Sequence, residues 1–534
     1  MRRGGGGPAT AARQRGQALL FISVTTVVVL LAMLVMFSTG QLAAYRMKLQ
    51  NTADAASYSG ALVQARDLNF SAYMNRAMIA NQVAVAQITS MVGWARALQD
   101  TYNGDFYSIA ETLADLSELS FLWTVPVDIY KPLSNGLKDV LDTVGKGMVV
   151  ILDFLIDALR YAELGYHVGM TVTIPETVNN VISANDANAS LSVLGWAGSV
   201  LNTAQHYLFV STFQPPQDKD GDKRFANVVD ASMDLFTKNR TLPIATWLPT
   251  PLLIDPVRLF TPGVGPLVMF YFHSGGTSLK AVSGDSSKNL QGYGAADATG
   301  LFVIFDITIS ILGIPIPIPF PLPPLPAGAG FAWAGNSGWS SDMFTTPESQ
   351  YVKHRNAAND GSDSDAAVEY GGAYFDPETA VTYWIKASDG QGSSNKLDSR
   401  AFLRDYYDIK GNASGSTSNQ AKASGDPNYQ NTTAPSLFLE IERPSNTIAT
   451  SSSPTFQIGG GSGGQLDLPD ATEGAKLRAM SKAEAYFSRP TDLFARDDKK
   501  TEYGSLYSPY WQPHLLPNSL LEQAASFLGD SLLP

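Results

Sequence analysis

The sequence predicts an α+β protein. An N-terminal transmembrane helix extends into a helical region, and a β-rich, loop-rich extracytoplasmic domain follows. Three observations predict this class: residues 17–45 carry no charge, residues 42–210 repeat apolar side chains every three or four positions, and short apolar runs separated by turn residues follow Gln214. The expected segments are a cytoplasmic basic tail (1–16), a transmembrane helix (17–40), a helical extracytoplasmic region (41–212), a β-rich, loop-rich domain (213–474) and a C-terminal helical and aromatic segment (475–534).

Composition and charge exclude several classes of protein. The 534 residues include no cysteine, so disulfides, zinc–thiolate sites and cysteine nucleophiles are excluded. The net charge is −12, but the first 50 residues hold six basic side chains and no acidic one. The rest of the chain therefore carries 31 basic against 49 acidic residues, a net charge of −18. Such an acidic body does not suit nucleic-acid binding, which needs cations to displace counterions from phosphate.

The uncharged run predicts one membrane crossing. Residues 18–40 are 23 residues long, and at about 1.5 Å per residue a helix of this length spans a hydrocarbon core of about 30 Å. Arg2, Arg3, Arg13 and Arg15 precede the run, so the positive-inside rule keeps the N-terminus in the cytoplasm and sends the bulk of the chain across. The apolar region of a cleaved signal peptide is shorter, which favours an uncleaved anchor in contact with the lipid bilayer.

The segment after the apolar run consists largely of small residues. Residues 48–61 read KLQNTADAASYSGA, with small residues four positions apart. Small side chains let another helix approach closely, and a glycine inside a helix, which costs about 1 kcal/mol against alanine, is tolerable where close packing compensates. Either this is an alanine-rich solvent-facing helix, or it packs against a partner or the chain's own downstream helices. The candidate interaction face is Ala53, Ala56, Ser57, Gly60 and Ala61.

These same residues carry a family resemblance. The motif RGQALL (15–20), the apolar run, LQNTADAA (49–56) and SGA (59–61) together resemble the N-terminal segment of TadG-like proteins of the bacterial tight-adherence (Flp) pilus-assembly system. The stretches AEAYFSRP (483–490) and YSPYWQ (507–512) are similar to the ending of long members of that family. Pilin-like subunits of this system carry Glu five residues after the processed glycine, where this chain has Phe21, so cleavage after Gly16 is not expected.

The resemblance implies a function and a location. It implies a single-pass protein of the bacterial inner membrane that acts as a structural or assembly component of a Tad/Flp-type pilus or secretion apparatus. Its partners would be other pilus-assembly or pilin-like membrane proteins, bound by helix docking, with no enzymatic activity and no cofactor. The alternative is a surface adhesin or glycan-binding module on the same anchor, which the acidic, loop-rich outer domain and its aromatic clusters (370–375, 406–407 and 503–511) favour.

Beyond Gln214 the pattern predicts strands and loops. Residues 301–325 are apolar but contain Asp306 and six prolines, so they do not form a second spanning helix. Residues 314–320 alternate apolar residues with proline, which predicts an edge strand or polyproline segment that either covers its own sheet or binds a partner. The remaining strand candidates are residues 268–273, 301–312, 378–387 and 436–442, and the loop candidates are 411–436 and 451–464.

Motifs for chemistry are weak. Asp218, Asp220 and Asp222 alternate like the first ligands of a calcium loop, but the sixth and twelfth positions hold Lys223 and Val229 instead of glycine and an acid. The motif DGSDS (360–364) matches a D-x-S-x-S metal motif but follows a polar segment instead of a buried strand. The five histidines show no paired spacing, and no nucleophile or phosphate-binding motif is present. No catalytic, cofactor or metal site is therefore predicted, with the three aspartates as weak metal candidates.

Overall fold

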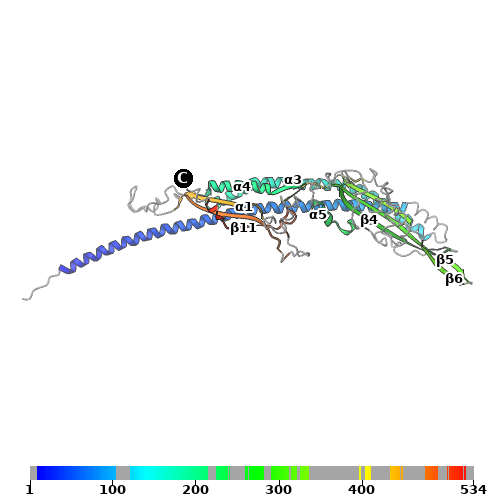
Figure 1. Cartoon of the computed structure of the whole chain (residues 1–534), viewed down its shortest axis with the longest axis horizontal. Helices are drawn as coiled ribbons and strands as arrows, with labels where there is room; N and C mark the ends of the chain where they lie inside the picture. The colour runs from blue at the N-terminus through cyan, green and yellow to red at the C-terminus, as the bar shows by residue number, and fades with distance from the viewer. Residues whose placement is uncertain are drawn as a thin grey trace, which may run out of the picture.

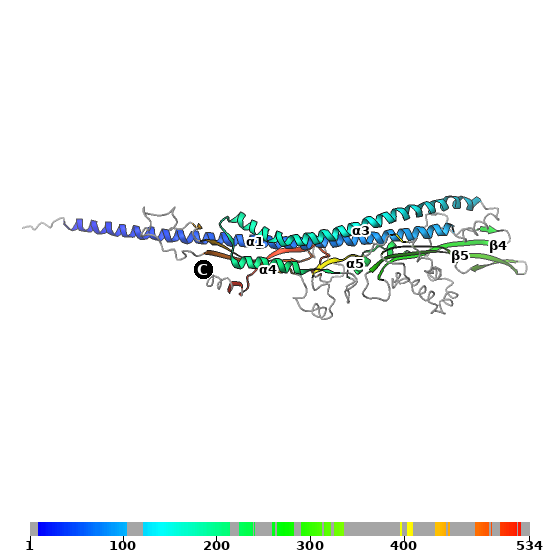
Figure 2. The same cartoon turned by 90° about the horizontal axis from the view of Figure 1, so that it is seen from above.

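The structure is a computed structural model of the whole chain. It describes residues 9–103, 121–213, 224–238, 240, 259–261, 264–281, 290–311, 314–321, 325–335, 396–397, 403–409, 433–444, 447–448, 476–490, 493, 502, 504–520 and 522–524. The described chain is strongly elongated, and one helix runs from the N-terminal end through most of the body (Figures 1 and 2).

This helix, α1 (Ala9–Asn103), is 95 residues long. No proline occurs within it, and its sequence passes from the apolar run into alanine-rich segments of good helix formers, so nothing interrupts its backbone hydrogen bonds. The predicted transmembrane helix and its predicted extension are thus one continuous element.

Two further helices run beside α1. Helix α3 (Phe121–Asn185) packs lengthwise on α1, and α4 (Val193–Phe209) packs on α3. In Figure 2, α3 lies along one side of α1 and the strands lie along the other. The side chain of Ser192 caps α4 by accepting a hydrogen bond from the Gly195 amide at 3.0 Å. Two short helices, α5 (Arg224–Ser232) and α6 (Leu235–Lys238), also contact α1.

The described strands form three antiparallel groups. The group that packs on α1 around Ala53 has the order β1 (Ser190–Leu191), β9 (Leu437–Pro444), β10 (Lys476–Phe487) and β11 (Trp511–Leu516). A middle pair joins β2 (Val210–Phe213) to β8 (Tyr406–Ile409). The far group has the order β3 (Leu259–Thr261), β4 (Val264–Ala281), β5 (Leu290–Ile311) and β6 (Ile314–Pro321), with β7 (Leu325–Gly335) also paired to β5.

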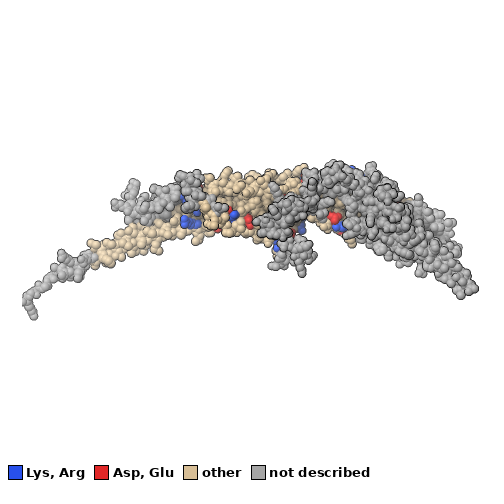
Figure 3. Space-filling model, viewed as in Figure 1, with Lys and Arg blue, Asp and Glu red and all other residues tan. Residues whose placement is uncertain are grey.

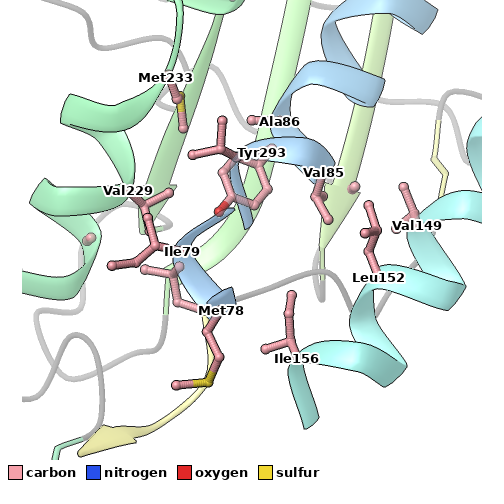
Figure 4. Packing of buried hydrophobic residues seen from close by; sticks show 14 of the residues in the cluster. Met78, Ile79, Val85, Ala86, Val149, Leu152, Ile156, Val229, Met233 and Tyr293 are labelled. Carbon is pink, nitrogen blue, oxygen red and sulfur yellow. The ribbon is translucent and has the colours of Figure 1, made fainter. Parts of the chain in front are cut away.

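The core follows α1 as a series of separate apolar clusters instead of one centre. The largest joins α1, α3, α5 and β5, and Figure 4 shows Tyr293 of β5 among side chains of α1 and α5. A second cluster joins the α1 segment around Ala53 to α3 and to β9 and β10. Because each cluster is built on α1, this helix is the shared support of the body.

Most strand predictions are met, and one element differs. Residues 268–273, 301–312, 314–320 and 436–442 fall largely within β4, β5, β6 and β9, and β6 pairs with β5 alone among the described strands, as expected of an edge. The prediction of a helical C-terminal segment is wrong for residues 476–487, which form β10. Its helix-forming composition is overridden by packing, since alternate residues from Leu477 to Phe487 are buried. The candidates at 378–387, 411–432 and 451–464 lie outside the described residues.

Candidate functional site: the long helix and the groups it gathers

The N-terminal part of α1 stands clear of the body. The most apolar 18-residue window of the described helix, near its start, has a mean hydropathy of 2.8 and is 0% buried within the chain. In Figure 3 this part is a thin uncharged rod, and the blue and red of charged residues begin where the body begins. Phe21 is 72% exposed and Met36 is 74% exposed. This helix is long and apolar enough to cross a membrane, with the apolar side chains facing outward as lipid contact requires.

The candidate interaction face lies inside the body. Ala53, Ala56, Ser57, Gly60 and Ala61 are all buried. The hydroxyls of Ser57 and Ser481 on β10 are hydrogen-bonded at 2.7 Å. A Cβ on Gly60 would overlap the Leu437 side chain of β9 and stand 3.1 Å from Val178 of α3. The chain's own strands and helix therefore occupy this face.

Small residues on both partners make this approach possible. The inward positions of β10 include Ala479, Ser481, Ala483 and Ala485, which are as small as the α1 residues they meet. Small side chains on facing elements bring the two backbones close. The small residues of KLQNTADAASYSGA thus allow a sheet to pack closely on α1 just after the apolar run.

A row of buried polar side chains continues along the same helix. Their positions repeat at intervals of seven, the spacing that keeps residues on one side of a helix. The buried members are Ser57, Gln64, Ser71, and then Asn75, Gln82, Thr89 and Arg96. Most bind groups far away in the sequence: Gln64 donates to Asn202 at 2.6 Å, Asn75 donates to the carbonyls of Tyr407 and Leu506, and Arg96 binds Asp142. Each such bond fixes one later segment at one position on α1.

Asp67, a buried residue of α1 between Gln64 and Ser71, contacts two histidines. Its Oδ2 lies 2.6 Å from Nδ1 of His167 on α3 and 2.8 Å from Nε2 of His206 on α4. The side chains are 0%, 5% and 2% exposed, respectively. One ligand atom from each residue lies within 4.8 Å of the others, an arrangement that could hold a metal ion. This cluster could not be predicted from the sequence, because its members come from three helices that are far apart in the chain. The available signal was a polar residue on the buried face of each helix.

Burial and charge shift the pKa values of these groups. Burial alone would raise the pKa of Asp67, but the hydrogen bonds and positive charge of His167 and His206 bring it below 3.8. Burial would lower the pKa of His167, and Asp67 instead raises it above 6.5. Glu163, one helical turn before His167, is fully buried. Burial raises its pKa well above 4.5, and the charges of Asp67 and Asp408 raise it further.

Helix α3 exposes a long apolar stripe on the side away from α1. All fourteen exposed positions from 147 to 172 are apolar or glycine: Gly147, Met148, Val150, Ile151, Phe154, Leu155, Ala158, Tyr161, Ala162, Leu164, Gly165, Val168, Gly169 and Val172. Phe154 is 71% exposed and Val172 is 66% exposed. Added side chains at Gly165 and Gly169 would meet open space. We call these fourteen residues the α3 stripe; exposed apolar surface of this extent marks an interaction site.

The weak metal candidates stay predictions. Asp218, Asp220 and Asp222 lie outside the described residues, and so does the 360–364 motif. Of the predicted aromatic clusters, Tyr406, Tyr407 and Trp511 are buried in the core. These three rings are therefore not available to a glycan.

Comparison with known proteins finds one likeness, in the N-terminal part of the chain. Residues 16–65 match the family model Tad, described as putative Flp pilus-assembly TadE/G-like. The match covers the apolar anchor and the small-residue face, the two features that carried the resemblance in the sequence. No curated protein and no solved structure matches the chain. The Tad match supports a pilus-assembly component.

Proposed function

We propose that this protein is a membrane-anchored assembly component of a bacterial Tad/Flp-type pilus or secretion apparatus, acting by binding and not by catalysis. The observation that carries the proposal is the Tad match over residues 16–65. The structure adds support because the matched segment begins as a bare apolar helix and continues without a break into the helix that supports the folded body.

The proposed topology places the N-terminus in the cytoplasm and the body outside the inner membrane. The tail before the anchor carries Arg2, Arg3, Arg13 and Arg15, while only Arg46 and Lys48 follow closely after it. Basic residues in short flanking segments are retained on the cytoplasmic side. The acidic body would then lie in the periplasm.

The α3 stripe is the proposed docking surface, since the small-residue face is filled by the chain itself. Met170 of α3 packs against Val63 of α1, which lies 23 residues past Gly40. At about 1.5 Å per residue this places that end of the stripe roughly 35 Å beyond the anchor, outside the same bilayer. Lipid is thus not its partner.

The proposed occupant is an apolar helix of another pilus-assembly protein. The stripe extends over 25 residue steps, or about 38 Å of helix, with no charged side chain at an exposed position. Open space over Gly165 and Gly169 leaves room for a second helix to approach closely. The neighbouring helix α4 adds exposed apolar side chains, including Trp196 at 61%.

Two lysines on the stripe test this docking surface. We expect Phe154→Lys combined with Val172→Lys to leave the stability of the body within about 0.5 kcal/mol per exposed site, because neither side chain is buried. Co-purification of the other pilus-assembly proteins from the detergent-solubilised native membrane should fall strongly, together with pilus assembly. Leu235→Lys is the matched control, since Leu235 on α6 is 78% exposed outside the stripe. Unchanged co-purification and assembly in the double variant would refute docking through the stripe.

The N-terminal peptide separates an anchored component from a fibre subunit. Mass spectrometry of membrane and sheared-surface fractions should find a membrane-bound chain that retains residues before Gly16, because Phe21 replaces the glutamate of processed subunits. A chain beginning at Gln17 in the sheared fraction would show instead that the protein is processed and built into the pilus.

A further inference from the structure

The three-residue cluster of Asp67, His167 and His206 has no role in the proposed docking. It joins α1, α3 and α4 at one point in the body. The hydrogen-bond partners of the two histidines indicate which ring nitrogens carry a hydrogen and what can lie between the three side chains.

The backbone fixes the tautomer of His167. Its Nε2 lies 3.2 Å from the carbonyl oxygen of Tyr207, which can only accept a hydrogen bond, so Nε2 carries a hydrogen. In the neutral ring, Nδ1 then presents a lone pair. This lone pair faces Oδ2 of Asp67 at 2.6 Å, and two acceptors at that distance repel each other. A cation must therefore lie between them, either a proton or a metal ion.

Other contacts of the cluster favour a metal ion. His206 directs a second ring nitrogen, Nε2, at the same Asp67 oxygen, so three ligand atoms converge on one region. As a purely hydrogen-bonded cluster the group leaves Oδ1 of Asp67, the second oxygen of the same carboxylate, buried without a partner. Buried polar atoms are normally satisfied, and an ion bound by both carboxylate oxygens of Asp67 would satisfy this one.

We propose that Asp67, His167 and His206 bind one divalent transition-metal ion of the zinc class. Imidazole nitrogens with one carboxylate oxygen suit zinc and its neighbours better than calcium or magnesium, which prefer all-oxygen sites. The Nε2–H of His167 bound to a backbone carbonyl is the outer contact that typically orients a metal-binding histidine. A water molecule would complete the four ligands that zinc usually takes.

The ion would act as a cross-link in a chain that has no cysteine. Asp67 lies 27 residues past Gly40, so the site would hold α3 and α4 on α1 about 40 Å beyond the anchor. A metal held by folded but not by unfolded chain stabilises the folded state by mass action. The inference does not depend on the pilus-assembly role.

Metal binding is tested first on the wild-type chain, so that no variant has to fold. The full-length protein, purified in detergent through a tag without histidine, is stripped with a chelator and titrated with Zn²⁺, Co²⁺ or Mg²⁺. We expect about one zinc per chain by elemental analysis, a higher melting temperature with Zn²⁺ but not Mg²⁺, and visible d–d absorption with Co²⁺. A melting temperature indifferent to Zn²⁺ and no Co²⁺ spectrum would overturn the proposal in favour of a proton shared by Asp67 and His167.

Variants locate the site. His206→Gln should weaken zinc affinity by more than about 100-fold, because loss of a direct ligand exceeds the effect of losing an outer contact. His273→Gln is the matched control, since His273 is also buried against an aspartate, Asp297, in the far sheet. Equal zinc binding by wild type and His206→Gln would place the metal elsewhere and overturn the assignment.

Discussion

Single buried residues determine how segments that are far apart in the sequence are joined in the body. In the far sheet, the guanidinium of Arg240 donates two hydrogen bonds to Asp297 at 2.6 and 2.7 Å, and His273 lies 3.0 Å from the same carboxylate. The Arg240 and Asp297 side chains are 0% exposed. Removing one member of such a pair leaves a buried charge uncompensated, which typically costs 3–5 kcal/mol.

The Asp297 cluster predicts a loss of stability in acid. Burial would raise the pKa of Asp297, but Arg240 and His273 bring it below 3.8. A carboxyl with a depressed folded-state pKa contributes stability above its unfolded pKa, and this contribution disappears as the pH falls from about 4 through the folded value. We therefore expect the free energy of unfolding of the wild type to fall between pH 5 and pH 3. The decrease should be smaller in Asp297→Asn, which lacks this carboxyl.

Denaturant unfolding of the full chain in detergent at the two pH values measures this difference. Asp297→Asn should also lower stability at neutral pH by about 3–5 kcal/mol, because Arg240 then lacks its counterion. The control is Asp139→Asn, at an aspartate whose side chain is 72% exposed. An identical pH dependence in wild type and Asp297→Asn would contradict the assigned role.

At the scale of elements, the predictable features are those with local causes. The anchor could be predicted because an uncharged run of 23 residues needs no tertiary context, and the strand at 314–320 because proline restricts its pairing. The strand β10 could not be predicted, because its alanines, its lysines and Glu484 favour a helix, and its strand form depends on pairing with β9 and β11 and on packing against α1. The Asp67 cluster was hidden because 100 residues separate Asp67 from His167.

The close packing of β9 and β10 on α1 predicts that larger side chains on this face of the helix destabilise the protein. Gly60→Leu should destabilise the body by roughly 1–3 kcal/mol or more, because its side chain would overlap Leu437 and press on Val178. Gly147→Leu on α3 is the matched control, since nothing lies within 4 Å of an added Cβ there. Thermal unfolding followed by circular dichroism compares the two. Equal melting temperatures in both variants would mean that the helix and sheet do not pack closely at Gly60.

At the scale of the whole molecule, one uninterrupted helix serves both as the anchor and as the support of the body. Because α1 enters the body without a flexible joint among its described residues, the position of every attached element is set relative to the anchor. The α3 stripe and the Asp67 cluster would therefore be held at fixed heights above the membrane. A rigid, elongated form of this kind suits a protein that must present a binding surface at a set distance.

The absence of cysteine makes the orientation directly measurable. Single-cysteine variants Arg13→Cys, before the anchor, and Met47→Cys, at a 68% exposed position just after it, carry one reactive thiol each. In spheroplasts with an intact inner membrane, a membrane-impermeant maleimide should label Met47→Cys at once and Arg13→Cys only after the membrane is opened. The cysteine-free wild type should remain unlabelled under both conditions. Immediate labelling of Arg13→Cys alone would place the body in the cytoplasm. The chain would then violate the positive-inside rule, and its proposed role outside the inner membrane would be wrong.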